Sequence, residues 1–240
     1  MKKITRSSEL LWLFGIIFVA LGVAICSKTN LGVSMIAAPA FVLSEALRGA
    51  IPFFSVGVME YIFQGALLTL MCVCIKKFNW KYLFAFAVAV IYGYTLNLFI
   101  FLLKDVCFDG LILRWVMLIV GDTITAFGVA CFFKTYMPLQ VYELFVAEFS
   151  KHFKININKI KWSFDLTLLV ISIVLTLTLF DDIGSVTWKT FATSSFHNIG
   201  LGTLVTTAIN SPIINIMGKI INKIFGSDPL IPKLEEFFKR

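Results

Sequence analysis

The feature that most constrains this chain is a series of long apolar runs with almost no charge. Each is about 20 residues long, enough to cross a hydrocarbon core of roughly 30 Å as a helix. The runs lack the alternation of apolar and polar residues that is typical of transmembrane barrels. The pattern predicts an all-α, polytopic transmembrane helical bundle with six spans: Glu9–Ser27, Ser55–Ile75, Tyr82–Leu103, Leu111–Phe133, Phe164–Phe180 and Ile199–Met217.

Composition supports this prediction. The chain has 240 residues, of which 59% are apolar and 15% charged, whereas soluble domains have about 45–50% and about 25%. The formal net charge of +7 is explained by cationic loops that hold the cytoplasmic side in place. No basic face interleaved with aromatic residues indicates nucleic-acid binding.

A motif at the end of the first run returns later in the chain. Gly22–Ser44 reads GVAICSKTNLGVSMIAAPAFVLS, and Gly128–Ser150, about 106 positions on, reads GVACFFKTYMPLQVYELFVAEFS. Each copy has an apolar run, Lys-Thr, a helix breaker (Gly32 or Pro138) and a short apolar helix. A repeat at this spacing indicates a duplicated half. We therefore expect a first membrane repeat over residues 1–110, a second over 111–217 and a cytoplasmic polar tail over 218–240.

The short helices after each motif, Ser34–Leu47 and Pro138–Phe149, leave two topologies open. If they are broken or re-entrant, the chain has six spans, and inside loops hold 11 Lys and Arg against 5 outside, leaving the tail aside. If they cross, there are eight spans and the count is about 10 to 6. The positive-inside rule favours six, with both termini cytoplasmic. Three spans per half would make the repeats inverted, an arrangement that recurs in secondary transporters, whereas eight would make them parallel.

Polar residues inside the spans are the candidate site residues, because a charge at the bilayer centre costs at least about 2.5–3.5 kcal/mol. Asp122, in the middle of its span, is either a cation or proton site or a buried carboxyl bonded to Thr125, Thr123 or a neighbouring helix. Gln64 and Asp165 occupy matched positions in the two halves and suit a shared cavity. Lys161 lies four residues before Asp165, so an ordinary i,i+4 ion pair is the alternative.

The last span is the most polar. Its residues Thr203, Thr206 and Asn210 share one helix face, which either lines a substrate path or packs closely against another helix. Asn97 in the span Tyr82–Leu103 is a further candidate, matched by Asn215. The predicted substrate or ion pathway is therefore formed by Gln64, Asn97, Asp122, Asp165, Thr203, Thr206 and Asn210.

Two lysines recur at the same place in the repeats, Lys28 and Lys134. They either bind an anionic substrate group or lipid phosphates, or extend from helix ends toward the interface. The sequence contains no catalytic signature and no histidine and cysteine spacing typical of zinc sites. We therefore expect no enzyme activity, no cofactor and no metal. The expected partners are membrane lipids, a small solute or ion, and a second copy of the chain in a homo-oligomer.

Three stretches carry a resemblance to a known family: LGVAICSKTNLGVSMIAAP, KKFNWKYLFAFAVAVIYGYTLNLF and IGLGTLVTTAINSPI. With these the chain resembles the YczE/YyaS/YitT-like bacterial integral membrane proteins, over roughly Leu10 to Met217. The resemblance implies a multi-pass protein of the bacterial cytoplasmic (inner) membrane with a duplicated core. It implies no catalytic residues, since the role of that family is not established. The chain departs from the family pattern at two places. Pro138 in the second copy replaces a glycine of the family's glycine-rich turn, and Asn210-Ser211-Pro212 stands where the family has a later glycine.

The duplicated architecture and the polar residues inside the spans favour a transporter or channel for a small solute or ion, with a central site between two repeats. The alternative is a non-transporting membrane accessory or receptor protein that acts through a partner. Such a protein would bind its partner through the basic segment Lys151–Lys161 or the tail.

Overall fold

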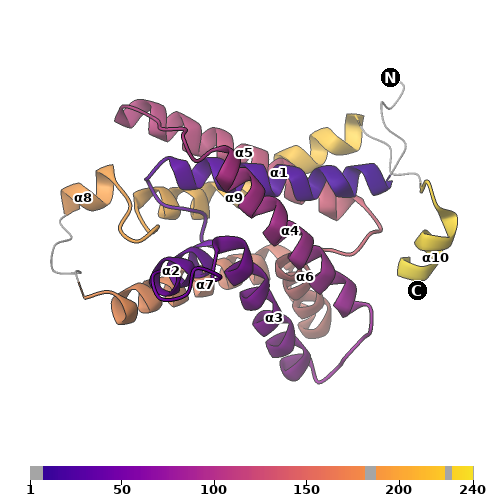
Figure 1. Cartoon of the computed structure of the whole chain (residues 1–240). Coiled ribbons are helices and arrows are strands. Elements are labelled where there is room, and N and C mark those ends of the chain that lie inside the picture. The colour runs from indigo at the N-terminus through magenta and orange to yellow at the C-terminus, as the bar shows by residue number, and fades with distance from the viewer. Residues whose placement is uncertain (1–7, 182–187, 225–228, 240) are drawn as a thin grey trace.

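A computed structural model of the chain describes residues 8–181, 188–224 and 229–239. Apart from one isolated β-bridge between Phe196 and Ile199, the regular structure of these residues is helical (Figure 1). The helices are α1 (Ser8–Lys28), α2 (Ala38–Arg48), α3 (Val56–Ile75), α4 (Tyr82–Leu102), α5 (Leu111–Lys134), α6 (Val141–Phe153), α7 (Ile157–Leu179), α8 (Trp188–Thr193), α9 (Leu201–Ile224) and α10 (Pro232–Lys239). The predicted all-α class is confirmed.

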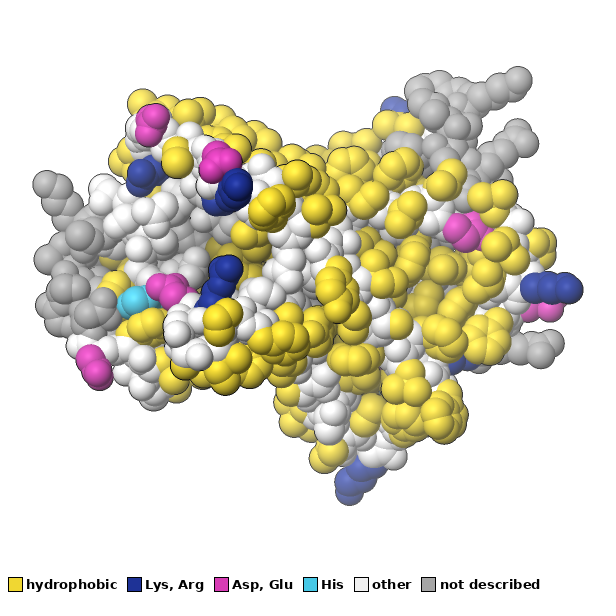
Figure 2. Space-filling model, in the orientation of Figure 1, with side chains coloured by type: hydrophobic (Ala, Val, Ile, Leu, Met, Phe, Trp, Pro, Cys, Tyr) yellow, Lys and Arg dark blue, Asp and Glu magenta, His cyan; other side chains and the backbone are white. Residues whose placement is uncertain are grey.

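Six of these helices, α1, α3, α4, α5, α7 and α9, are long and apolar enough to cross a membrane. Their outer faces carry large exposed apolar side chains, such as Val73, Ile112 and Val174. In Figure 2, hydrophobic side chains cover the central part of the face shown, and charged side chains lie toward its ends. An apolar belt of this kind is what a lipid environment requires, so the protein is a multi-pass membrane protein.

The short helices start later than the sequence indicates. The predicted helix from Ser34 begins only at Ala38, which leaves Pro39 in the first turn, where its missing N–H is not needed. The predicted helix from Pro138 begins at Val141 and extends to Phe153, because Gln140 before it is extended. Eleven residues of α2 reach about 17 Å at 1.5 Å per residue, too little to cross the bilayer alone.

Two long helices begin or end beyond their predicted limits. α7 starts at Ile157 rather than Phe164, since the side chain of Asn156 accepts a hydrogen bond from the Asn158 N–H and caps this earlier turn. α9 continues through Pro212 and past Met217 to Ile224. In both cases polar turns continue an apolar helix beyond the hydrophobic run.

The centre of the fold is the antiparallel contact between α1 and α5, the first helices of the two copies. A Cβ on Gly22 would lie 2.5 Å from the carbonyl oxygen of Gly121, and one on Gly15 would lie 3.2 Å from that of Gly128. These are the repeat-matched glycines: Gly15 corresponds to Gly121, and Gly22 to Gly128. Exchanging the copies therefore turns one contact into the other. Small residues at such crossings let backbones approach closely.

The other helix contacts follow the same exchange. The exchange replaces α1, α2, α3 and α4 by α5, α6, α7 and α9. It then turns α2–α3 into α6–α7, and α2–α7 into α6–α3. It also turns α1–α4 into α5–α9, and α3–α4 into α7–α9, and all of these contacts occur. Six crossings put α1 and α5 in opposite directions, as observed, whereas eight would put them in the same direction.

The start of α1 is tied to distant parts of the chain. The Glu9 carboxylate accepts hydrogen bonds from the Leu230 and Ile231 N–H groups before α10, and from the Tyr136 hydroxyl in the α5–α6 connector. Burial and the Glu9 carboxylate raise the pKa of Tyr136, so this hydroxyl stays a donor at neutral pH. These bonds place the start of α1, the α5–α6 connector and α10 at one end of the bundle.

We expect Gly22→Ala to destabilise the protein by about 1–3 kcal/mol, because there is no room for an added methyl group. The new Cβ would lie 2.2 Å from Thr125 Oγ1 and 2.6 Å from the Thr125 nitrogen. SDS-induced unfolding of the purified protein measures the change. The control is Gly49→Ala, since a Cβ there meets nothing within 4 Å. Equal stability of the two variants would contradict the close approach of α1 and α5.

Candidate functional site

Between the two halves lies a small central cavity with a volume of ≈ 20 Å³. Its walls come from α1, the α1–α2 connector, α4, α5, the start of α6 and its connector, and α9. The polar residues that line it are Ser34, Tyr92, Thr125, Gln140, Tyr142, Glu143 and Asn210. A cavity of this size holds about one water molecule, yet an unusual number of polar groups converge on it.

A first buried polar link joins α5 to α9 beside this cavity. The Asn210 side-chain amide donates to Asp122 Oδ1 at 2.8 Å, and the two residues are 3% and 1% exposed. The other oxygens, Asp122 Oδ2 and Asn210 Oδ1, have no hydrogen-bond partner among the described residues. The carboxyl group is therefore only half satisfied at the depth of a transmembrane helix.

A second buried link joins α3 to α6. Glu60 Oε2 accepts hydrogen bonds from the Tyr142 hydroxyl at 2.9 Å and from the Gln64 amide at 3.3 Å. Glu60 and Gln64 are fully buried, and the remaining oxygen of each is unpartnered within the described chain. Tyr142 also lines the central cavity, so this link borders the same space as Asn210.

A third group lies where α6 meets α7. Lys161 Nζ and Asp165 Oδ2 form an ion pair of 3.2 Å, as the i,i+4 spacing predicted. Glu143 and Lys161 line the same small cavity of ≈ 10 Å³. The Glu143 Oε2 atom has no hydrogen-bond partner among the residues described. Glu143 therefore connects the ion pair to the central cavity, which it also lines.

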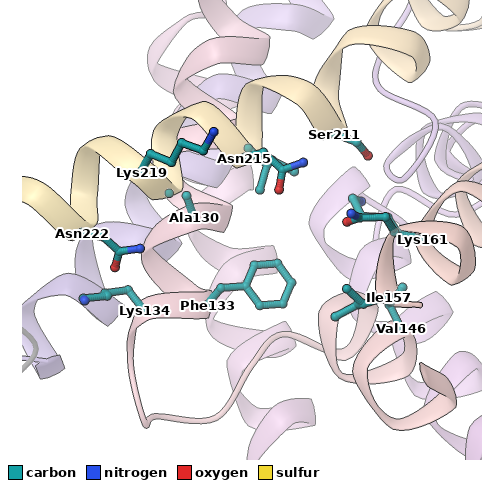
Figure 3. A pocket seen from close by; sticks show the side chains of 13 residues that line it. Ala130, Phe133, Lys134, Val146, Ile157, Lys161, Ser211, Asn215, Lys219 and Asn222 are labelled. Carbon is teal, nitrogen blue, oxygen red and sulfur yellow. The ribbon is translucent and has the colours of Figure 1, made fainter. Parts of the chain in front are cut away.

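A wide pocket of ≈ 630 Å³, here called the entry pocket, opens at the end of the bundle that holds the start of α1. Figure 3 shows Ser211, Asn215, Lys219 and Asn222 along α9, across the pocket from side chains of α5, α6 and α7. The entry pocket shares Phe133, Val146 and Lys161 with a ≈ 10 Å³ cavity. That small cavity shares Ile36, Tyr142 and Glu143 with the central cavity. Three adjoining spaces thus lead from one end of the protein to its centre.

At the opposite end, hydrogen bonds join the α1–α2 connector to the segment before α9 and to the first turn of α9. A separate pocket of ≈ 460 Å³ opens there, lined by residues that include Glu45, Arg48 and Asn198, and it shares no lining residue with the central cavity. The Val33 N–H donates to the Asn198 carbonyl at 3.0 Å, and the Gly202 N–H to the Leu31 carbonyl at 2.9 Å. The Asn198 amide also donates to Glu45 Oε2 at 2.6 Å. Gly32 has a φ of 109°, and a Cβ on it would lie 2.3 Å from Thr203 Oγ1. Only glycine suits this backbone conformation and this close approach.

The structure brings some of the predicted residues together and places others apart. Asp122 and Asn210 are bonded to each other, Gln64 is bonded to Glu60, and Asp165 is paired with Lys161. The Thr206 hydroxyl donates to the Gly202 carbonyl of its own helix, and Thr203 Oγ1 accepts from the Gly200 N–H. Neither threonine lines a cavity described above.

Asn97 has a different place in the structure. Its side-chain oxygen accepts the Gly57 N–H at 2.9 Å, and its amide donates to Ser55 Oγ at 2.9 Å. It thus satisfies one of the free N–H groups at the start of α3.

Sequence reasoning left Gln140, Tyr142 and Glu143 out of the pathway. The signal for Glu143 is present: it is an acidic residue in the first turn of a short helix that follows a helix breaker. Gln140 and Tyr142 carry no such signal, because only packing turns them to the centre.

A family model described as "Family of unknown function (DUF6198)" matches residues 6–219. The chain belongs to this family. The DUF6198 match includes all residues that line the central cavity, and all that line the entry pocket except Asn222. No curated protein and no solved structure matches the chain. The more specific resemblance to the YczE/YyaS/YitT-like proteins stays a prediction.

We expect Asp122 and Asn210 to be energetically coupled, because each side chain supplies a hydrogen-bond partner to the other. A double-mutant cycle of Asp122→Ala, Asn210→Ala and the double variant, measured by SDS-induced unfolding, should give about 0.6–1.7 kcal/mol. The control cycle pairs Asn210→Ala with Thr123→Ala, since the Thr123 hydroxyl donates to Ile119 of its own helix. A coupling energy no larger than in the control cycle would contradict the bond.

Proposed function

We propose that this protein is a transporter or channel for a small solute or ion, with its central site between two repeats. The observation that carries the proposal is the central cavity. Three of the residues that line it, Gln140, Glu143 and Asn210, have buried polar atoms without a partner among the described residues, and a ≈ 10 Å³ cavity shares lining residues with both it and the entry pocket.

The cost of burying these groups is the first argument. The unpartnered atoms belong to Glu60, Gln64, Asp122, Gln140, Glu143 and Asn210. A buried polar group without a hydrogen bond costs roughly 1–3 kcal/mol by protein mutational data. Leucine at these positions would remove that cost, so stability does not account for the polar side chains. A solute, ion or proton that passes through the centre would supply the missing partners.

The unequal ends are the second argument. The entry pocket and the central cavity are joined by shared neighbours through the ≈ 10 Å³ cavity, whereas the ≈ 460 Å³ pocket at the other end shares no lining residue with the central cavity. An asymmetry of this kind would suit one state of an alternating-access cycle. We propose that residues 1–110 and 111–217 are inverted membrane repeats that rock about the glycine contact of α1 and α5. Motion would open the α1–α2 connector and close the entry pocket. In a channel, the α1–α2 connector would instead open while the entry pocket stays open.

We further propose that the protein lies in a bacterial cytoplasmic membrane with both termini and the entry pocket on the cytoplasmic side. The support is the excess of Lys and Arg in the loops at that end. Lys76 and Lys77 follow α3 there, Lys151 lies in the last turn of α6 and Lys154 follows it. The substrate would then be released to or collected from the cytoplasm in the state described.

We expect proteoliposomes containing the protein to accumulate at least one solute when they are incubated with a small-molecule extract of bacterial cells. Mass spectrometry of the washed vesicles identifies the solute. Asp122→Asn and Asn210→Ala should each lower its initial rate of uptake by about tenfold or more, the effect of losing one buried polar contact.

Thr123→Ala, on the same helix as Asp122, is the matched control and should transport as the unmodified protein does. If uptake is unchanged in both site variants, the central site is wrong. If the folded protein moves no solute at all, the accessory or receptor alternative is favoured.

The proposed orientation predicts which thiols an impermeant maleimide reaches. Cys107 is exposed in the loop between α4 and α5, so it should be labelled in intact spheroplasts of a bacterial host. Lys77→Cys, made together with Cys107→Ser, should be labelled only after the membrane is permeabilised. Labelling in the opposite order would show that the protein is inserted the other way round.

A further inference from the structure

The entry pocket has an unusual concentration of positive charge. Its lining includes Lys134 at the end of α5, Lys161 on α7 and Lys219 on α9, and it includes no Asp or Glu. Three lysines on three different helices therefore line one space of ≈ 630 Å³, within the range of small-ligand pockets. Like charges brought together in this way repel one another, and a bound anion would relieve the repulsion.

Two of these lysines have no counter-charge in the part of the chain that the structure describes. Lys161 pairs with Asp165, but Lys134 and Lys219 form no ion pair with a described carboxylate. Lys134 lies in the last turn of α5, where a cation also complements the helix dipole. Lys219 lies inside α9 rather than in its last turn, so the dipole does not account for it.

Neutral groups around the lysines suit an anion as well. Ser211, Asn215 and Asn222 offer hydroxyl and amide donors along α9 (Figure 3). On the opposite wall, Ile157 and Asn158 form the first turn of the 23-residue helix α7. The start of a helix carries partial positive charge and favours negatively charged groups.

The repeat supplies an internal comparison. Lys28 is the counterpart of Lys134 in the first copy, but its Nζ donates to the Lys104 carbonyl at 3.2 Å. It does not line the entry pocket, which lies at the other end of the bundle. The lysine of the first copy, Lys28, is thus bonded to the backbone. The lysine of the second copy, Lys134, lines the entry pocket and stays available to a ligand.

We infer that the entry pocket binds an oxyanion group, either as a small free anion such as inorganic phosphate or as the headgroup of an anionic lipid. Lys134 and Lys219 are its main charged contacts, and Asn215 and Asn222 add hydrogen bonds. This inference goes beyond the proposed function, since a binding site at the pocket can be measured whether or not the protein transports a solute.

The free-anion arm uses the full chain in neutral detergent and titrates inorganic phosphate at constant ionic strength by calorimetry. We expect saturable binding that Lys134→Gln and Lys219→Gln each weaken by about tenfold or more, as expected for loss of a charge-assisted hydrogen bond. Lys134→Arg, which keeps the charge, should retain most of the affinity. Lys28→Gln, with the same loss of net charge, is the matched control and should bind within about twofold of the unmodified protein.

The lipid arm uses nanodiscs of phosphatidylcholine with or without phosphatidylglycerol, followed by native mass spectrometry of the released protein. If a lipid headgroup is the ligand, phosphatidylglycerol stays bound to the unmodified protein and to Lys28→Gln, and is lost from the variant that combines Lys134→Gln with Lys219→Gln.

Either arm on its own supports the inference and identifies the source of the anion. The inference is overturned if neither probe binds, or if both probes bind the double lysine variant as tightly as the unmodified protein. Anion binding without solute uptake would contradict the proposed function and leave the anion site in place. Solute uptake that is unchanged by the lysine variants, with no anion binding, would contradict the anion site and leave the proposed function in place.

Discussion

The close antiparallel contact of α1 and α5 is the interaction on which the rest of the structure depends. Because glycine stands at each crossing point, the two backbones meet without intervening side chains. Val19 and Val23 of α1 and Thr125 and Val129 of α5 then form one wall of the central cavity. The same contact fixes the relative direction of the two halves. Within the second half α9 packs beside α5, and Asn210 there donates to Asp122.

Two similar halves nevertheless make unequal ends, and the connectors explain why. In the first copy, Gly32 adopts a positive φ and lets the chain press against Thr203, so the α1–α2 connector bonds to the segment before α9. The second copy has Pro138 instead, which has no N–H to donate and a fixed φ. Its connector contacts α1, where the Trp12 indole donates to the Pro138 carbonyl at 2.9 Å. The entry pocket stays open beside it.

Charge is also distributed unequally along the path. The cations Lys134 and Lys219 lie at the wide mouth, while Glu60, Asp122 and Glu143 lie deep inside, where none of them forms an ion pair with a described cation. Lys161 and Asp165 stand between the two regions as a neutral pair. An anion entering the pocket would therefore meet attraction at the mouth and repulsion at the centre unless the carboxyl groups were protonated or bound a cation. This arrangement suits a site that handles two kinds of charge.

The sequence by itself determined the class of fold, the six spans, the two short helices and the Lys161–Asp165 pair. These properties depend on local hydropathy and on neighbours three or four residues apart, which the order of residues specifies directly. Only the tertiary structure decided which polar residues meet. The partners Asp122 and Asn210 are 88 positions apart and Glu60 and Tyr142 are 82 apart, so their contacts depend on how each helix is rotated and how closely it packs. For the same reason Asn97 and Thr203, which look like pathway residues in the sequence, were placed instead at a helix start and at the close approach to Gly32.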